Sequence, residues 1–126
     1  MKYKWWLKFV VLNAMIQSPV MLHGQGFALV ELFTSQGCSS CPPADKLLSR
    51  LSEETYSGID NVFFLSMHVD YWNRLGWVDP YSSYAFINRQ KNYAAVLAND
   101  QVYTPQMIVN GETSFVGSDE GMAIKL

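Results

Sequence analysis

Cys38 and Cys41 are the only cysteines among the 126 residues of the chain, and two residues separate them. An apolar run precedes the pair, and a segment with helical spacing follows it. A thiol beside a helix N-terminus is acidified, and a second thiol one turn away can close a disulfide with it. The pattern therefore predicts a redox-active pair.

Two other interpretations of the pair stay open, a static disulfide and half of a zinc site. A structural zinc site needs further Cys or His ligands at set spacings. Only His23 and His68 remain in the chain, and neither follows such a spacing.

The composition is that of one ordinary globular domain, with 49% hydrophobic and 16% charged residues. The formal net charge is −2, and the Lys and Arg residues form no cluster. A nucleic-acid partner is therefore not expected.

The first 26 residues read as a secretory signal peptide, with an N-terminal membrane anchor as the alternative. Three lysines within the first eight residues precede an apolar run over 9–16, and Ser18-Pro19 follows it. The run is short for a bilayer span, so no stable membrane insertion is expected after cleavage. We expect a periplasmic or secreted bacterial protein whose domain covers residues 27–126, in a compartment where disulfides persist.

The first half of this domain has the pattern of a β-α-β unit. The run 27–34 predicts a central strand covered on both faces, and a helix is predicted from Pro42 to about Ser52. A residue before proline avoids the helical conformation, so the helix is expected to begin only at Pro42. The run 61–70 predicts the next, parallel strand.

The second half predicts a helix and a hairpin. An aromatic loop over 71–79 ends in Asp79-Pro80, which predicts an N-cap and a helix over 80–98. Strands are predicted at 106–109 and 113–116 around a type I′ turn at Asn110-Gly111. The start of a further helix follows, so the domain is expected to be incomplete at its C-terminus.

The order β-α-β-α-β-β resembles the thioredoxin fold, an α/β fold with a mixed central sheet. In that fold a cis-proline precedes the hairpin, and Thr104-Pro105 stands in that place. The resemblance implies that Pro105 lies against the cysteine pair, excludes metal and helps to dock an extended substrate, with Thr104 and Tyr103 beside it.

Thioredoxin-like proteins also carry a buried acid on the strand before the cysteines, and Glu31 resembles it. The resemblance implies that Glu31 takes a proton from Cys41 during the reaction. This chain has one inserted residue, which shifts the side-chain parity. A Glu31 paired with a Lys or Arg stays open as the alternative.

A closer resemblance is to the bacterial secreted family called domain of unknown function 1223. It is carried by the strings ELFTSQGCSSCPPAD at 31–45, HVDYW at 68–72 and VYTPQ at 102–106. The resemblance extends from about residue 27 to the end of the chain. The activity of that family is unsettled, and its members usually continue beyond this length.

Several nearby residues compete for a role. His68 ends a strand on the side of the sheet where ligands collect, so Cys38, Cys41 and His68 together offer a copper site. His68 can instead bond Asp70 or a loop carbonyl. The aromatic residues at 71, 72, 77 and 81 predict a recognition surface or part of the core. Ser39-Ser40 supplies hydroxyls that can donate to a thiolate.

The sequence therefore predicts an exported thiol-disulfide oxidoreductase. Cys38, as an accessible thiolate, attacks a partner disulfide, Cys41 resolves the mixed species, and Glu31 assists. The partner is a protein or small-molecule thiol or disulfide, and no cofactor is expected. The alternatives are a copper-handling module that uses His68, and a binding module with a structural disulfide.

Overall fold

The computed structural model of the chain describes residues 26–56, 61–97 and 101–125. The predicted signal peptide therefore lies outside the described residues, apart from Gly26. The elements are β1 (Ala28–Thr34), α2 (Pro42–Tyr56), β2 (Val62–His68), the 3₁₀ helix η1 (Asn73–Leu75), α3 (Tyr84–Val96), β3 (Gln106–Val109), β4 (Thr113–Val116) and α4 (Glu120–Ala123). This order confirms the predicted β-α-β-α-β-β arrangement.

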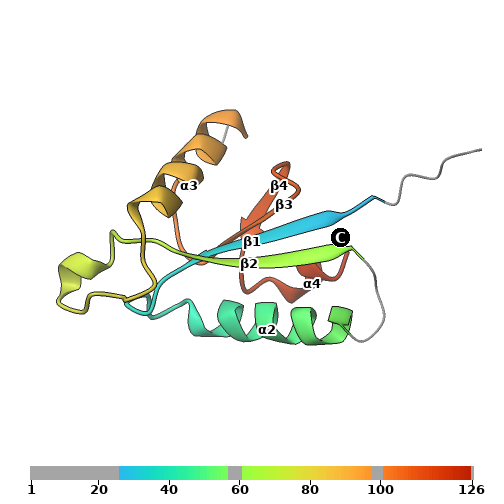
Figure 1. The fold of residues 1–126 in the computed structure, drawn as a ribbon, viewed down its shortest axis with the longest axis horizontal. Helices are drawn as coiled ribbons and strands as arrows, with labels where there is room; N and C mark the ends of the chain where they lie inside the picture. Colours follow the sequence, from blue (N-terminus) through green and yellow to red (C-terminus); the bar gives the residue numbers. More distant parts are fainter. Residues whose placement is uncertain (1–25, 57–60, 98–100, 126) are drawn as a thin grey trace, which may run out of the picture.

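The described strands form one mixed sheet in the order β2-β1-β3-β4 (Figure 1). β1 pairs parallel with β2, with Thr34 opposite His68, and antiparallel with β3, with Phe33 opposite Gln106. β1 is central, as predicted, because the crossover through α2 returns the chain parallel to it. The fold is α/β and thioredoxin-like.

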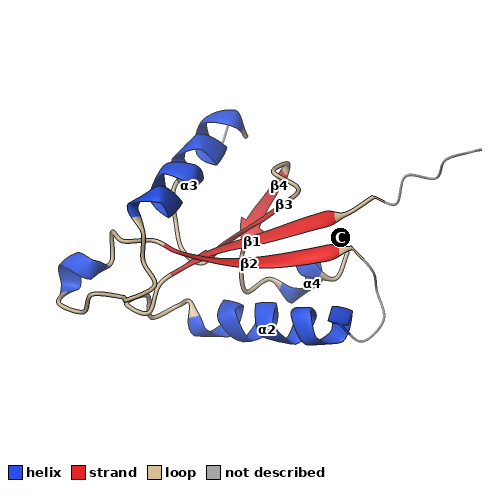
Figure 2. Cartoon of the chain, viewed as in Figure 1, coloured by secondary structure: helices blue, strands red, loops and turns tan. Residues whose placement is uncertain are grey.

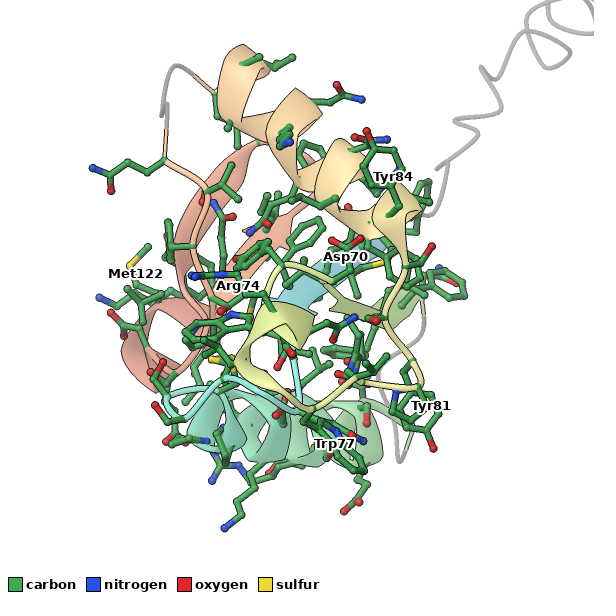
Figure 3. The ribbon with its side chains drawn as sticks, turned by 90° about the vertical axis from the view of Figure 1, so that its left-hand side faces the viewer. Asp70, Arg74, Trp77, Tyr81, Tyr84 and Met122 are labelled. Atoms are coloured by element: carbon green, nitrogen blue, oxygen red, sulfur yellow. A yellow bond between two sulfur atoms is a disulfide. The ribbon has the colours of Figure 1, made fainter. Side chains whose placement is uncertain are left out.

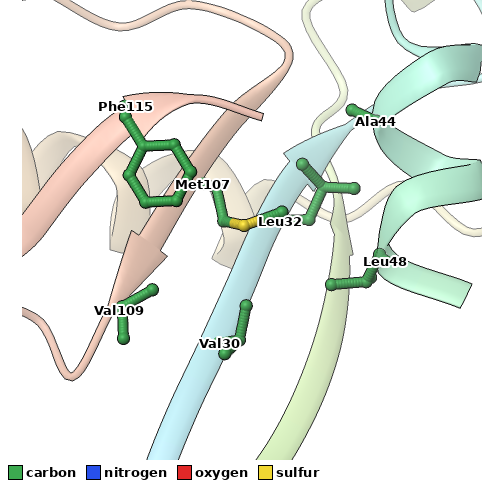
Figure 4. Packing of buried hydrophobic residues seen from close by; sticks show 7 residues of the cluster. All are labelled: Val30, Leu32, Ala44, Leu48, Met107, Val109 and Phe115. Atoms are coloured by element: carbon green, nitrogen blue, oxygen red, sulfur yellow. The ribbon is translucent and has the colours of Figure 1, made fainter. Parts of the chain in front are cut away.

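Helices cover both faces of the sheet, with α2 and α4 on one side and α3 on the other (Figures 1 and 2). Successive side chains of a strand point to opposite faces. Leu32 therefore packs toward Ala44 of α2, in a cluster that Figure 4 shows together with Met107 and Phe115. Phe33 packs on the other face, with Val69, Ile108 and Tyr93. The parity of β1 thus decides which helix each of its side chains meets.

Helix α3 begins at Tyr84 instead of the predicted residue 80. The N-cap is Ser83, whose side chain accepts a hydrogen bond from the Ala85 N–H. Asp79 is not the N-cap, because its carboxylate accepts the N–H of Tyr81 in a local turn and reaches other segments of the chain. Helix α2 extends to Tyr56, beyond the predicted end near Ser52.

The hairpin turn is confirmed, since Asn110 and Gly111 both have positive φ angles, 53° and 70°. Only a type I′ turn requires this at both central positions. Helix α4 is a single turn capped by Asp119. Within the described ranges, no helix has the length and apolar character needed to cross a membrane.

Candidate redox site around Cys38 and Cys41

Cys38 and Cys41 form a disulfide between the end of β1 and the start of α2, with a Cα–Cα distance of 5.4 Å. Both residues are buried, with 2% of Cys38 and 0% of Cys41 exposed. The expectation of an openly accessible outer sulfur is therefore wrong for this oxidised conformation. A partner can reach Cys38 only if a neighbouring segment moves.

Helix α2 leaves no free backbone donors near the cysteines. Its first two residues, Pro42 and Pro43, have no N–H groups, and the N–H groups of Ala44 and Asp45 both donate to the Cys41 carbonyl. Cys38 itself lies in a turn before the helix, where it accepts the Cys41 N–H at its carbonyl. The first turn of α2 therefore offers no free N–H group to the Cys38 sulfur.

Two hydroxyl groups meet the Cys38 sulfur instead. Thr104 Oγ1 donates to Cys38 Sγ at 3.4 Å, and Ser40 Oγ lies 3.5 Å from it. Thr104 belongs to the loop before β3, and its peptide bond to Pro105 is cis, as the resemblance implies. Pro105 is buried. The half-buried Tyr103 turns its carbonyl to the amide of Gln90.

The loop around η1, residues 71–79, contacts Thr104 and also the cysteine turn, which is the segment 35–41 before α2. The indole Nε1 of Trp72 donates to Thr104 Oγ1 at 2.8 Å. A Cβ atom added to Gly37 would lie 3.2 Å from the Trp72 Cβ, so a side chain at position 37 would crowd Trp72. The exposed Trp77 donates through Nε1 to Gln36 Oε1 at 2.9 Å.

The buried Asp79 side chain holds this loop in place by several hydrogen bonds. Its Oδ2 accepts the Gln36 N–H at 2.8 Å and lies 2.6 Å from His68 Nδ1, and its Oδ1 accepts the Tyr81 N–H. Burial alone raises the pKa of Asp79, but the hydrogen bonds from Gln36, His68 and Tyr81 outweigh burial and hold the pKa below its usual range. Asp79 therefore joins the end of β2, the cysteine turn and the start of the α3 segment as a carboxylate.

His68 is thus hydrogen-bonded to Asp79. The sequence suggested Asp70 or a loop carbonyl as its partner, and that prediction is wrong. In the described part of the chain, no three His, Cys, Asp or Glu side chains come together to hold a metal ion. Cys38, Cys41 and His68, which the sequence offered as an alternative copper site, are therefore not grouped as a metal site here.

Glu31 lies on the opposite face of the sheet from α2. Its fully buried carboxylate pairs with Arg89 Nε and accepts a hydrogen bond from the Tyr93 hydroxyl, and both partners belong to α3. The expectation that Glu31 lies under α2 is wrong, because the carboxylate is on the α3 face, and its role in proton transfer stays a prediction. The paired alternative is the arrangement found.

A buried polar cluster borders Thr104. Gln90 Nε2 donates to the Tyr103 carbonyl and to Gln106 Oε1, both at 2.7 Å. The Tyr71 hydroxyl and Gln90 Oε1 are buried without a hydrogen bond of standard geometry. Burial raises the pKa of Tyr71, whose neighbours include Thr104 and Gln90.

Sequence reasoning missed the contacts of Trp72, Asp79 and Arg89. The aromatic loop was recognised, and the structure divides it: Tyr71 and Trp72 pack against the core, whereas Trp77 and Tyr81 are exposed at 61% and 67%. Figure 3 shows Trp77 and Tyr81 along the outer side of this loop, with Tyr84 beyond them. No spacing rule relates Trp72 to Thr104, 32 residues away.

Comparison with known proteins is consistent with this architecture. The family model described as "Protein of unknown function (DUF1223)" matches residues 29–125. An X-ray crystal structure of a protein from Agrobacterium tumefaciens matches with a TM-score of 0.70 and 44% sequence identity, over 80% of this chain and 45% of that one. This chain thus spans less than half of that protein. No curated protein matches.

Proposed function

Since the chain belongs to the DUF1223 family, whose description assigns no activity, we propose from the site geometry that it exchanges disulfides with a thiol-bearing partner. The observation that carries the proposal is the Cys38–Cys41 disulfide at the start of α2, with Thr104, the residue before the cis-proline Pro105, against Cys38. Export to an oxidising compartment, which the N-terminal sequence favours, keeps the pair in this form.

The reaction begins when a partner thiolate attacks Cys38 Sγ. The Cys38–Cys41 bond breaks, Cys41 leaves as a thiolate, and Cys38 is held in a mixed disulfide. A second partner thiolate attacks the partner's own sulfur and releases Cys38. The partner thereby loses two electrons and gains a disulfide, the protein pair is reduced, and the two thiol protons pass to the released cysteines or to water. The same steps run in reverse from the reduced protein.

Cys38 is the attacked sulfur in this scheme because Cys41 is the more deeply buried of the two, and the hydroxyl groups near Cys38 help it to leave in the second step. The Thr104 and Ser40 hydroxyls stabilise a thiolate on Cys38 by hydrogen bonding. Cys41 is fully buried behind it, at the start of α2. Because Cys38 is only 2% exposed, we propose that the part of the loop around η1 beyond Trp72 moves away during exchange, while Trp72 keeps its bond to Thr104.

A trapping experiment tests this function. In Cys41→Ser, no neighbouring thiol can resolve a mixed disulfide on Cys38. The full chain should therefore form a stable mixed disulfide with oxidised glutathione or with a disulfide-bonded protein. Cys38→Ser is the matched control and should trap far less, because Cys41 is buried. Absence of any adduct with Cys41→Ser would remove the proposal.

The burial of both sulfurs favours a second candidate, a binding module in which the disulfide is a static brace. Structural disulfides have reduction potentials below about −300 mV, whereas exchanging pairs lie above that value. Equilibration of the native chain with dithiothreitol buffers decides between the two functions. A potential near −200 mV supports exchange, and resistance to reduction until the chain unfolds supports the brace.

A further inference from the structure

We propose that Trp72 is a positioning residue for the exchange reaction proposed above, because its indole N–H directs the Thr104 hydroxyl at the Cys38 sulfur. This role of Trp72 depends on the proposed exchange function, because orienting the hydroxyl matters only if Cys38 reacts. The contacts that carry it are the Trp72 Nε1 to Thr104 Oγ1 bond at 2.8 Å and the Thr104 Oγ1 to Cys38 Sγ bond at 3.4 Å.

The direction of these bonds follows from the groups involved. An indole nitrogen only donates, whereas a threonine hydroxyl has one hydrogen to donate and two lone pairs that accept. With Trp72 donating to its oxygen, Thr104 keeps its own hydrogen for another acceptor. The Cys38 sulfur lies within reach of that hydrogen. The Tyr71 oxygen also lies near Thr104, but no hydrogen bond of standard geometry joins them.

The hydroxyl matters because α2 offers the sulfur little else. The two prolines at the start of α2 carry no N–H groups, and the next two N–H groups are bound to the Cys41 carbonyl. Among the described residues, the hydrogen-bond partners of Cys38 Sγ are the hydroxyls of Thr104 and Ser40. The Ser40 contact is longer, and its donor is undetermined by geometry. Thr104 is therefore one of two donors to a Cys38 thiolate, and its hydroxyl is the one that Trp72 orients.

Trp72 strengthens this donor in two ways. A hydrogen bond received by the Thr104 oxygen polarises its O–H group, so the bond that Thr104 gives becomes stronger. The same bond restricts rotation of the hydroxyl, which otherwise turns to suit any acceptor. A bond to the charged form of a thiol lowers its pKa. Cys38 then leaves more readily when the mixed disulfide is resolved.

The test uses the full chain in a Cys41→Ser background, where Cys38 is the single thiol. The rate of alkylation by iodoacetamide is measured against pH. The midpoint of this profile gives the pKa of Cys38, and its plateau reports how easily the reagent reaches the sulfur. If the Trp72 ring shields the Cys38 sulfur from the reagent, its loss changes the plateau rate. If Trp72 acts through the hydrogen bond to the sulfur, its loss changes the midpoint pH.

Trp72→Phe keeps an aromatic ring and removes the N–H group. We expect it to raise the midpoint so that the thiolate fraction below the midpoint falls several-fold, and Thr104→Val to lower that fraction roughly tenfold. In the double variant, the loss should equal that of Thr104→Val alone, because Trp72 acts through Thr104. Thr104→Ser should retain the parent midpoint.

Trp77→Phe is the matched control, since Trp77 also lies in this loop and donates through its Nε1, but to Gln36. It should leave the midpoint in place. An unchanged midpoint in Trp72→Phe, with Thr104→Val shifted, overturns the role of Trp72, and so does a Trp72→Phe shift that persists fully in the double variant. Circular dichroism identifies any variant that fails to fold, and Thr104→Val then decides whether the hydroxyl acts on sulfur.

The two proposals fail in different ways. Loss of the exchange function appears as absence of glutathione adducts in the Cys41→Ser parent, whatever the midpoints are. Loss of the positioning role appears as equal midpoints in a parent that does form adducts.

Discussion

The carboxylate of Asp79 lies 2.6 Å from the His68 ring and accepts the Gln36 N–H at 2.8 Å, so one buried side chain joins the end of β2 to the cysteine turn. This relationship holds the loop around η1 in place beside the disulfide. The loop is also held by the bond from Trp77 to Gln36, so the proposed opening of the site must break both contacts.

Replacing Asp79 with Ala should destabilise the protein by about 2–4 kcal/mol, because the N–H groups of Gln36 and Tyr81 and the ring of His68 lose a charged acceptor that is itself buried. We also expect faster reduction of the disulfide by dithiothreitol, since the loop loosens. Urea unfolding and the rate of thiol release measure the two effects. Asp70→Ala is the control, because Asp70 is the acceptor of none of these three bonds. Equal effects of the two substitutions would contradict the prediction.

Stability should depend on pH through Asp79. Burial raises the pKa of this carboxyl, but the bonds from Gln36, His68 and Tyr81 lower it more, so the folded pKa lies below the ordinary 3.8. Its contribution is complete above that ordinary value and is lost as the pH falls through the folded pKa. We expect the free energy of unfolding to drop as the pH falls below about 4. Asp79→Asn should reduce this dependence on pH. If the free energy of unfolding of this variant falls with pH as steeply as that of the parent, the prediction is wrong.

The pair between Glu31 and Arg89 predicts an asymmetry between two substitutions. Glu31 is fully buried, whereas 44% of the Arg89 side chain is exposed. Arg89→Met leaves a buried carboxylate without its cation and should cost about 2 kcal/mol, more than Glu31→Gln, which leaves a cation that water can reach. Denaturant unfolding of both variants tests this. The opposite order would show that the pair is not what stabilises Glu31.

Glu31→Gln should also leave the rate of glutathione adduct formation in the Cys41→Ser background unchanged. The carboxylate lies on the α3 face, bonded to Arg89 and Tyr93, away from Cys41. Stopped-flow or quenched mass spectrometry measures the rate. A large decrease in a folded variant would restore the proton-transfer role that the sequence suggested.

Gly117 should not tolerate a side chain. A Cβ atom there would lie 2.6 Å from Leu32 Cδ1 and 3.1 Å from the Pro105 Cβ. We expect Gly117→Ala to cost about 1–3 kcal/mol through overpacking. Gly121→Ala is the control, since its added Cβ would meet only an ordinary contact at 3.4 Å, inside α4. Calorimetric melting compares the two, and equal melting temperatures would contradict the prediction.

Local patterns predicted most of the fold. The apolar run of β1, the prolines that open α2 and the Asn110-Gly111 turn each follow from the conformational preferences of neighbouring residues. The start of α3 was misplaced because Asp79 satisfies distant donors that the sequence does not reveal. Ser83, four residues later, was free to cap the helix.

The candidate site divides in the same way. The spacing of the two cysteines predicted a disulfide among its alternatives, and the resemblance to the thioredoxin fold implied the cis peptide bond between Thr104 and Pro105. A shift of one residue along β1 decides which face of the sheet Glu31 lies on. On the face it occupies, Glu31 forms an ion pair with Arg89 of α3.

The sequence by itself determined the order of the elements, the sheet with β1 at its centre and the pairing of Cys38 with Cys41, because these depend on contacts along the chain and on the apolar periodicity. Only the tertiary structure decided that Trp72 meets Thr104, that Asp79 meets His68 and that Cys38 is buried. Those contacts join segments whose approach depends on how the whole sheet and both helix layers pack, and no local preference encodes them.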